Sequence, residues 1–158
     1  MSEDINIRIV KKDRDTNTWK EVKLYSKKGD DFYPIEAYSF RNYELFDILK
    51  GNKDDLAICP IDFNSLSKEV KEEIQTYEDL TGFYDFKEIN LADLKVYFLE
   101  HPKVIDLDYY SDDDNDPKKY KDNPVKNFID RIEQYIDFAE DGFYIPHSDI
   151  KIIYWFDC

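Results

Sequence analysis

A run of acidic residues in the second half of the chain has the residue types most able to bind a ligand. It holds six aspartates and two tyrosines within eleven positions: Asp106, Asp108, Tyr109, Tyr110, Asp112, Asp113, Asp114 and Asp116. Carboxylates so close together resemble calcium ligands, but a loop of the EF-hand type needs glycine at its sixth position and glutamate at its twelfth. Counted from Asp112, those positions hold Pro117 and Asn123, so the run is not an EF-hand. A looser calcium site is the alternative to a solvated acidic loop, which blocks of like charge usually form.

The aromatic residues among these acids indicate that the segment contacts another protein. Tyrosine is enriched in protein interfaces, and alternating acidic and aromatic side chains suit a groove lined by basic residues. The same argument extends to Tyr120, Phe143 and Tyr144. The alternative is that these rings only cover the edge of the core.

A second candidate site comprises Arg41, Asn42 and Tyr43, at the start of an expected helix. Arg and Asn can bind a carboxylate or a phosphate there, and the positive end of the helix dipole favours an anion. The competing interpretation is structural: Asn42 caps the helix, Tyr43 packs on the core and Arg41 pairs with one of the many acids.

The string His147-Ser148-Asp149 contains the residue types of a hydrolase triad. Adjacent residues cannot form a triad, because its members converge from separate loops. We therefore expect a turn at this string, and a helix end at His101, which precedes Pro102. The chain has only two histidines and no glycine-rich phosphate loop, so the sequence predicts a protein that is not an enzyme and implies no cofactor.

The charge balance limits the classes of partner. The 158 residues include 36 acidic and 22 basic ones, a formal net charge of −14. Binding to nucleic acid or to anionic lipid depends on Lys and Arg, so direct binding to DNA, RNA or a membrane surface is not expected. A protein with a basic surface is the more natural partner, and assembly into a homo-oligomer stays open.

The ends of the chain and its cysteines indicate the compartment. Cys59 and Cys158 form no CxxC pair, so the sequence contains no zinc or redox motif and does not suggest a disulfide framework. Residues 1–4 are acidic and lack the apolar core of a signal peptide. No apolar run approaches the roughly 20 residues of a membrane span. These features predict that the protein is located in the cytoplasm.

Periodicity predicts a single α+β domain over residues 1–158. Ile5, Ile7 and Ile9 alternate with polar residues as in a half-buried strand, which we expect to pair with a strand over 19–25. The final stretch, 150–157, is apolar on both faces and predicts a covered strand. About four helices should pack on this small antiparallel sheet. Residues 26–31 are expected to leave the sheet as a charged loop, and residues 104–123 to be the least regular and most mobile segment.

Two strings suggest a family. Residues 41–49, RNYELFDIL, resemble the RNY-x-LF-x-x-L segment of small uncharacterised proteins encoded by bacteriophages and prophages. Residues 150–157, IKIIYWFD, are similar to the V-R-I-V-x-W-F-D ending of the same proteins, and Leu66 to Val70 match their LS-x-EV string. Where the relatives carry histidine and tryptophan before the third helix, this chain has Tyr84-Asp85-Phe86, so the resemblance transfers no histidine-dependent role. It implies a phage origin without implying an activity.

These observations together predict a phage-encoded binding protein that neutralises a host factor. The expected target is part of a defence system, and the acidic residues between 106 and 116 would meet a basic surface made for nucleic acid, as an anti-CRISPR-like inhibitor or DNA mimic does. The alternative is a protein that sequesters a nucleotide immune signal in a pocket lined by tyrosine and arginine, with Arg41, Asn42 and Tyr43 as its ligand-binding residues.

Overall fold

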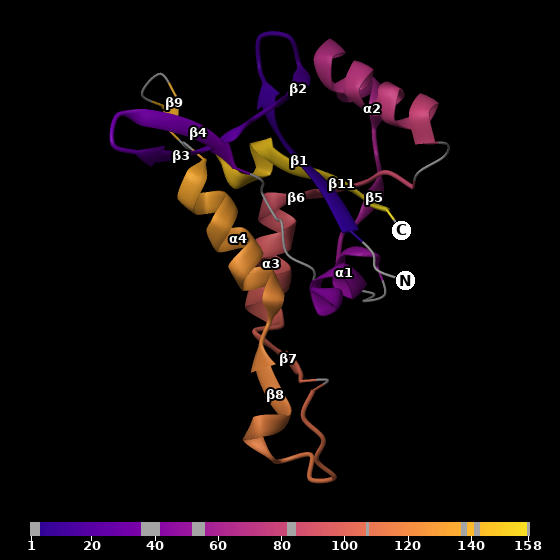
Figure 1. Ribbon diagram of the computed structural model, residues 1–158, viewed down its shortest axis with the longest axis vertical. Helices are drawn as coiled ribbons and strands as arrows, with labels where there is room; N and C mark the ends of the chain where they lie inside the picture. Colours follow the sequence, from indigo (N-terminus) through magenta and orange to yellow (C-terminus); the bar gives the residue numbers. More distant parts are fainter. Residues whose placement is uncertain are drawn as a thin grey trace.

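The fold is organised around the C-terminal strand, which lies at the centre of a five-stranded antiparallel sheet (Figure 1). This computed structural model describes residues 4–35, 42–51, 56–81, 85–106, 108–136, 139–140 and 143–157. The strand order across the sheet is β2 (Thr18–Glu21), β1 (Asp4–Asp13), β11 (Ile150–Asp157), β6 (Lys87–Asn90) and β5 (Cys59–Pro60).

Strand β11 separates two hydrophobic clusters, because its side chains alternate between the two faces of the sheet. Ile150, Ile152 and Tyr154 belong to the larger cluster, whereas Ile153 and Trp155 belong to the smaller one. All five side chains are fully buried. The prediction of a covered strand with two apolar faces is confirmed.

Within the described residues, four helices cover the sheet, in agreement with the prediction of about four (Figure 1). Helices α1 (Tyr43–Leu49), α3 (Leu91–Glu100) and α4 (Pro124–Tyr135) contribute to the larger cluster. Helix α2 (Lys68–Thr81) packs on the opposite face through Val70 and Ile74. The predicted class, a single α+β domain with a small antiparallel sheet, is therefore confirmed. No helix in the described ranges is long and apolar enough to cross a membrane.

The helix starts agree with the local sequence signals. The side-chain oxygens of Asn42, Asn90 and Asn123 accept hydrogen bonds from backbone N–H groups in the first turns of α1, α3 and α4. Ser67 similarly accepts from the N–H of Val70 at 3.4 Å at the start of α2. Each bond provides an acceptor for a backbone N–H group in the first turn, which has no partner within the helix.

Residues 19–35 differ from the expectation. The predicted strand over 19–25 is two strands, because β2 ends at Glu21 and β3 (Leu24–Lys28) pairs with β4 (Asp31–Ile35) in a separate hairpin. The charged loop expected over 26–31 is thus the end of β3 and a tight turn. Gly29 lies in that turn with φ of +64°, a conformation that glycine adopts readily.

A narrow arm extends beyond the ends of α3 and α4, at the lower end of Figure 1. It consists of β7 (Lys103–Ile105), the 3₁₀ turn η2 (Pro117–Lys119) and β8 (Tyr120–Asp122), with β7 and β8 paired antiparallel. Residues 104–123, expected to be the least regular segment, thus contain most of two short paired strands and a 3₁₀ turn. The remaining short elements are η1 (Phe63–Ser65), β9 (Ala139–Glu140), β10 (Phe143–Tyr144) and η3 (His147–Asp149).

Candidate functional site

The six aspartates and two tyrosines identified in the sequence lie together at the end of this arm (Figure 1). We call Asp106 and residues 108–119 the acidic tip. The tip is joined to the domain by the β7–β8 ladder and by two flanking backbone hydrogen bonds. The N–H of Asp106 donates to the carbonyl of Lys119 at 2.8 Å, and the N–H of Asn123 donates to the carbonyl of Pro102 at 2.9 Å. These bonds hold the tip at the end of a two-stranded stalk.

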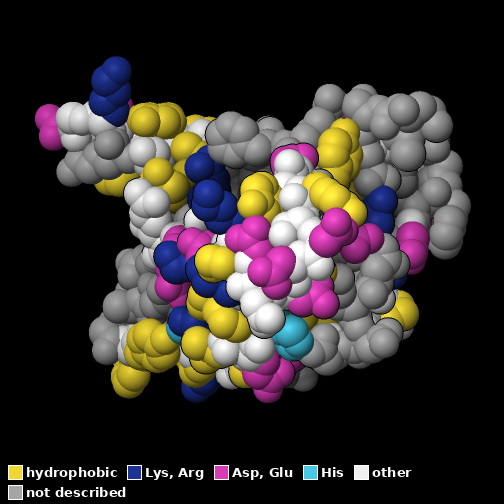
Figure 2. All heavy atoms as spheres, turned by 90° about the horizontal axis from the view of Figure 1, so that it is seen from below, with side chains coloured by type: hydrophobic (Ala, Val, Ile, Leu, Met, Phe, Trp, Pro, Cys, Tyr) yellow, Lys and Arg dark blue, Asp and Glu magenta, His cyan; other side chains and the backbone are white. Residues whose placement is uncertain are grey.

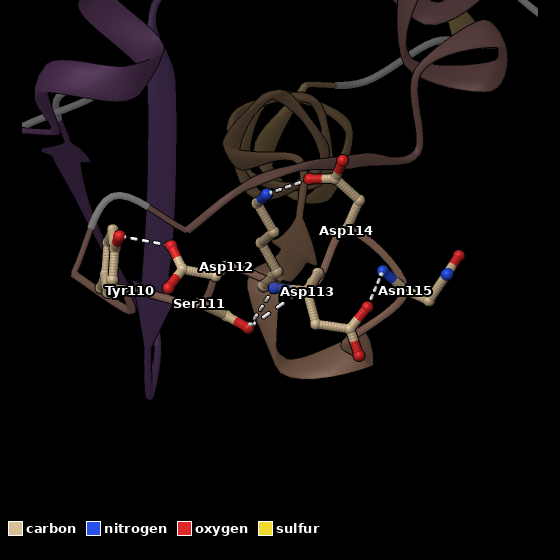
Figure 3. Close-up of polar contacts among 7 residues, drawn as sticks. Tyr110, Ser111, Asp112, Asp113, Asp114 and Asn115 are labelled. Atoms are coloured by element: carbon tan, nitrogen blue, oxygen red, sulfur yellow. Dashed lines mark hydrogen bonds and ion pairs between the residues drawn. The ribbon is translucent and has the colours of Figure 1, made fainter.

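Half of the six carboxylates fix the backbone of the tip. Asp106, Asp113 and Asp116 each accept, at 3.0 Å, a hydrogen bond from the backbone N–H two residues further on (Figure 3 shows the bond from Asn115 to Asp113). An Asx turn of this kind replaces a missing backbone partner and holds a tight bend. The acidic residues therefore shape the loop as well as charging it.

The two tyrosines of the tip are bonded to its carboxylates. Tyr109 donates its hydroxyl to Asp116 at 2.8 Å, and Tyr110 donates to Asp112 at 2.5 Å (Figure 3 shows the bond of Tyr110). Each bond stabilises the protonated phenol and so raises the pKa of both tyrosines. The Tyr110 ring is nevertheless 85% exposed, so its face is open to contact.

Lysines neutralise part of the negative charge. Lys119 binds Asp114 at 2.6 Å, and Lys121 binds Glu44 of α1 at 2.7 Å. Residues 103–122 contain seven aspartates and four lysines, which gives a net charge of −3. The arm is therefore acidic, but less so than the aspartate run alone suggests.

We expect Lys119→Met to raise the pKa of Asp114. The hydrogen bond and the charge of Lys119 hold the pKa of Asp114 below its usual value in the native protein. The stabilising effect of the Lys119–Asp114 pair is therefore fully present above the usual pKa of an aspartate, and it is lost as pH falls through the lowered pKa of Asp114. A titration of the side-chain carboxyl carbons by NMR would measure the change. The matched control is Lys118→Met, which removes the same charge one residue away and should leave the pKa of Asp114 unaffected.

The tip presents apolar surface beside its charges. Seen from below, acidic side chains gather near the middle of the face, with hydrophobic and basic side chains around them (Figure 2). Ile105 is 52% exposed and Tyr120 is 42% exposed, on β7 and β8 respectively. Acidic side chains next to exposed rings combine the two properties that a protein interface uses, charge complementarity and buried aromatic contacts.

The structure separates two of the other three predicted aromatics from the tip. Tyr120 lies at the base of the tip, whereas Phe143 and Tyr144 form β10, which pairs with β9 in a separate two-stranded sheet. Both β10 side chains are well exposed. They belong to a different surface, described below.

The structure describes two of the three residues of the alternative site at the start of α1. Arg41 lies outside the described residues. Asn42 Oδ1 accepts a hydrogen bond from the N–H of Leu45 at 3.1 Å, which is the capping contact predicted. Tyr43 is exposed and meets Phe46 edge-on, with ring centroids 5.8 Å apart. The capping contact favours the structural interpretation of Asn42, whereas the exposure of Tyr43 differs from the expectation that it packs on the core.

The two histidines lie in local contacts, as expected. His147 is in η3, immediately before β11, where burial lowers its pKa. His101 is the C-cap residue of α3, and its ring stacks on Tyr97. Within the described residues, no group of three or more His, Cys, Asp or Glu side chains is arranged to hold a metal ion, and this includes the described aspartates of the tip.

Comparisons with protein-family models, with curated proteins and with solved structures found no match to this chain. Sequence reasoning found the residues of the tip, but it missed a second surface formed by Lys11, Arg14 and Lys20. The pairing of β1 with β2 brings these residues together, and only the hairpin register could have shown it.

Proposed function

We propose that this chain is a binding protein whose acidic tip docks on a basic surface of a protein partner. The observation that carries the proposal is the placement of the tip, because a charged loop with exposed rings stands at the end of a stalk, away from the sheet (Figure 1). A protruding element of this kind can enter a groove that a flat acidic surface cannot.

The electrostatics support this mode of binding. The net charge of −14 attracts a basic partner over distances of roughly 8–10 Å at moderate salt. At contact, Tyr110 and Tyr120 supply rings that can be buried against the partner. Charge would accelerate the encounter, and ring burial would slow dissociation.

The resemblance of residues 41–49 and 150–157 to phage-encoded proteins supports a host protein as the partner. A basic surface made for nucleic acid, such as that of a CRISPR nuclease or another DNA-handling enzyme, would accept the tip in place of phosphates. On this proposal the chain neutralises a host defence factor by binding and without catalysis. It acts in the cytoplasm of the host cell and does not itself bind nucleic acid.

Affinity capture from a bacterial lysate tests the proposal. The bait is the full chain, and the comparison bait carries Asp112→Asn, Asp113→Asn, Asp114→Asn and Asp116→Asn, which we call the four-Asn variant. We expect a protein with a basic surface to be retained by the wild type at low salt, released as salt rises, and lost with the four-Asn variant. Equal retention by both baits would contradict a role for the tip.

The second candidate function is sequestration of a nucleotide. Asn42 and Tyr43 give it no support at the start of α1, for the reasons above. A groove elsewhere on the chain, between β1, β2 and β10, does favour a nucleotide ligand.

A further inference from the structure

A groove of about 650 Å³ lies between the β1–β2 turn and β10. Its walls include Lys11, Arg14, Lys20, Phe143 and Tyr144. The volume is within the range of about 300–1,000 Å³ that small-molecule sites occupy. Four basic and three acidic residues line it, an excess of one positive charge in a chain whose net charge is −14. This local excess of positive charge favours an anion over a cation as the ligand of the groove.

The register of the hairpin places two of these cations side by side. Lys11 on β1 is directly opposite Lys20 on β2, so both side chains project from the same face of the sheet. Like charges at directly opposed positions are destabilising. Asp13 offsets part of this repulsion by accepting a bond from Lys20, which lowers the pKa of Asp13 to about 2.

Arg14 adds a third cation with capacity for a ligand. Its Nη2 binds Asp149 at 3.0 Å, yet the side chain remains 76% exposed. A guanidinium has five N–H donors in a planar fork. The bond to Asp149 orients the Arg14 guanidinium and uses only part of these donors. Such a group suits the oxygens of a phosphate.

The opposite wall of the groove is aromatic. Phe143 is 77% exposed and Tyr144 is 64% exposed. A second cavity of about 270 Å³ adjoins the groove, because Lys11 and Ile145 line both. Tyr25 and Tyr135 also line this second cavity. Exposed rings next to cations suit a nucleotide, because its base can stack on the rings while its phosphates bind the cations.

We propose that this groove binds a nucleoside phosphate, with the phosphates at Lys11, Arg14 and Lys20 and the base against Phe143 and Tyr144. A small nucleotide fits the proposal better than a nucleic-acid strand, because the net charge of −14 repels a long polyanion. This site is separate from the acidic tip and does not depend on it.

Calorimetric titration of the full chain with ATP, inorganic triphosphate and adenosine tests the proposal. We expect ATP to bind more tightly than triphosphate or adenosine, since only ATP uses both walls. Arg14→Gln should weaken ATP binding about tenfold or more, whereas Lys126→Gln, which removes a charge from α4, should not. Phe143→Ala should weaken ATP binding about fivefold or more, whereas Phe32→Ala, at another exposed phenylalanine, should not.

Three results would overturn the nucleotide site. The first is no binding of ATP at millimolar concentration, and the second is equal affinity for ATP and triphosphate, which would leave no role for a base. The third is an equal loss of affinity in Arg14→Gln and Lys126→Gln. The four-Asn variant should bind ATP as the wild type does, so failure of the tip proposal would leave this result unchanged.

Discussion

Replacing Ile152 by alanine should lower the free energy of unfolding by about 2–5 kcal/mol. Ile152 is fully buried in β11, between Ile9 of β1 and Ile89 of β6, and it belongs to the larger hydrophobic cluster. Its truncation removes apolar area and leaves a cavity that close-packed neighbours fill only in part. Urea denaturation followed by circular dichroism measures the change, which is a large part of the roughly 5–15 kcal/mol that stabilises a typical domain.

Ile105→Ala is the matched control for this substitution. Ile105 lies in β7 on the arm and is 52% exposed, so the same truncation should change the free energy of unfolding by about 0.5 kcal/mol or less. If both variants lost similar stability, β11 would not be the centre of the core, or the arm would be packed against it.

The four-Asn variant should associate with the captured partner about tenfold more slowly, or slower still, than the wild type. It removes four negative charges from the tip and almost preserves side-chain size. Its association rate should also depend less on salt, because fewer charges steer the encounter. An asparagine oxygen can still accept the Asx-turn bonds of Asp113 and Asp116, so the melting temperature should stay within a few degrees of the wild type. Stopped-flow mixing over a salt series measures these rates.

The control for charge is a variant with four neutralised acids on the helices. Glu69→Gln, Glu72→Gln, Asp93→Asn and Asp130→Asn change exposed positions of α2, α3 and α4, and they alter the net charge equally. If this variant slowed association as much as the four-Asn variant did, net charge and not the tip would explain the rate. Tyr109→Ala with Tyr110→Ala should mainly accelerate dissociation, because the rings act after the encounter.

Local sequence signals predicted the helices and the central strand well. Asn42 caps α1 as expected, and Asn90 and Asn123 cap α3 and α4 in the same way, because a cap depends only on residues one turn away. The apolar residues on both faces of 150–157 likewise required a covered strand. The β3–β4 hairpin was missed, although Gly29 at its turn was an available signal. The ladder between β7 and β8 pairs Val104 with Lys121. The alternation of apolar and polar residues within either short strand does not predict this pairing.

The site was predicted as a set of residues but not as a geometry. The sequence could show that six aspartates and two tyrosines are close along the chain. It could not show which carboxylates form Asx turns or that Lys119 binds Asp114, because these contacts depend on the folded path of the loop. The juxtaposition of Lys11 and Lys20 follows from the exact register of β1 and β2, which a one-residue slip would abolish.

Competition between this chain and double-stranded DNA for the captured partner tests the central claim most directly. The partner is first bound to labelled DNA, and release of the label is followed by fluorescence polarisation as the chain is added. If the acidic tip occupies a surface made for nucleic acid, the wild type displaces the DNA and the four-Asn variant requires a much higher concentration. A stable complex of partner, DNA and wild-type chain, or equal displacement by both forms, would contradict the account.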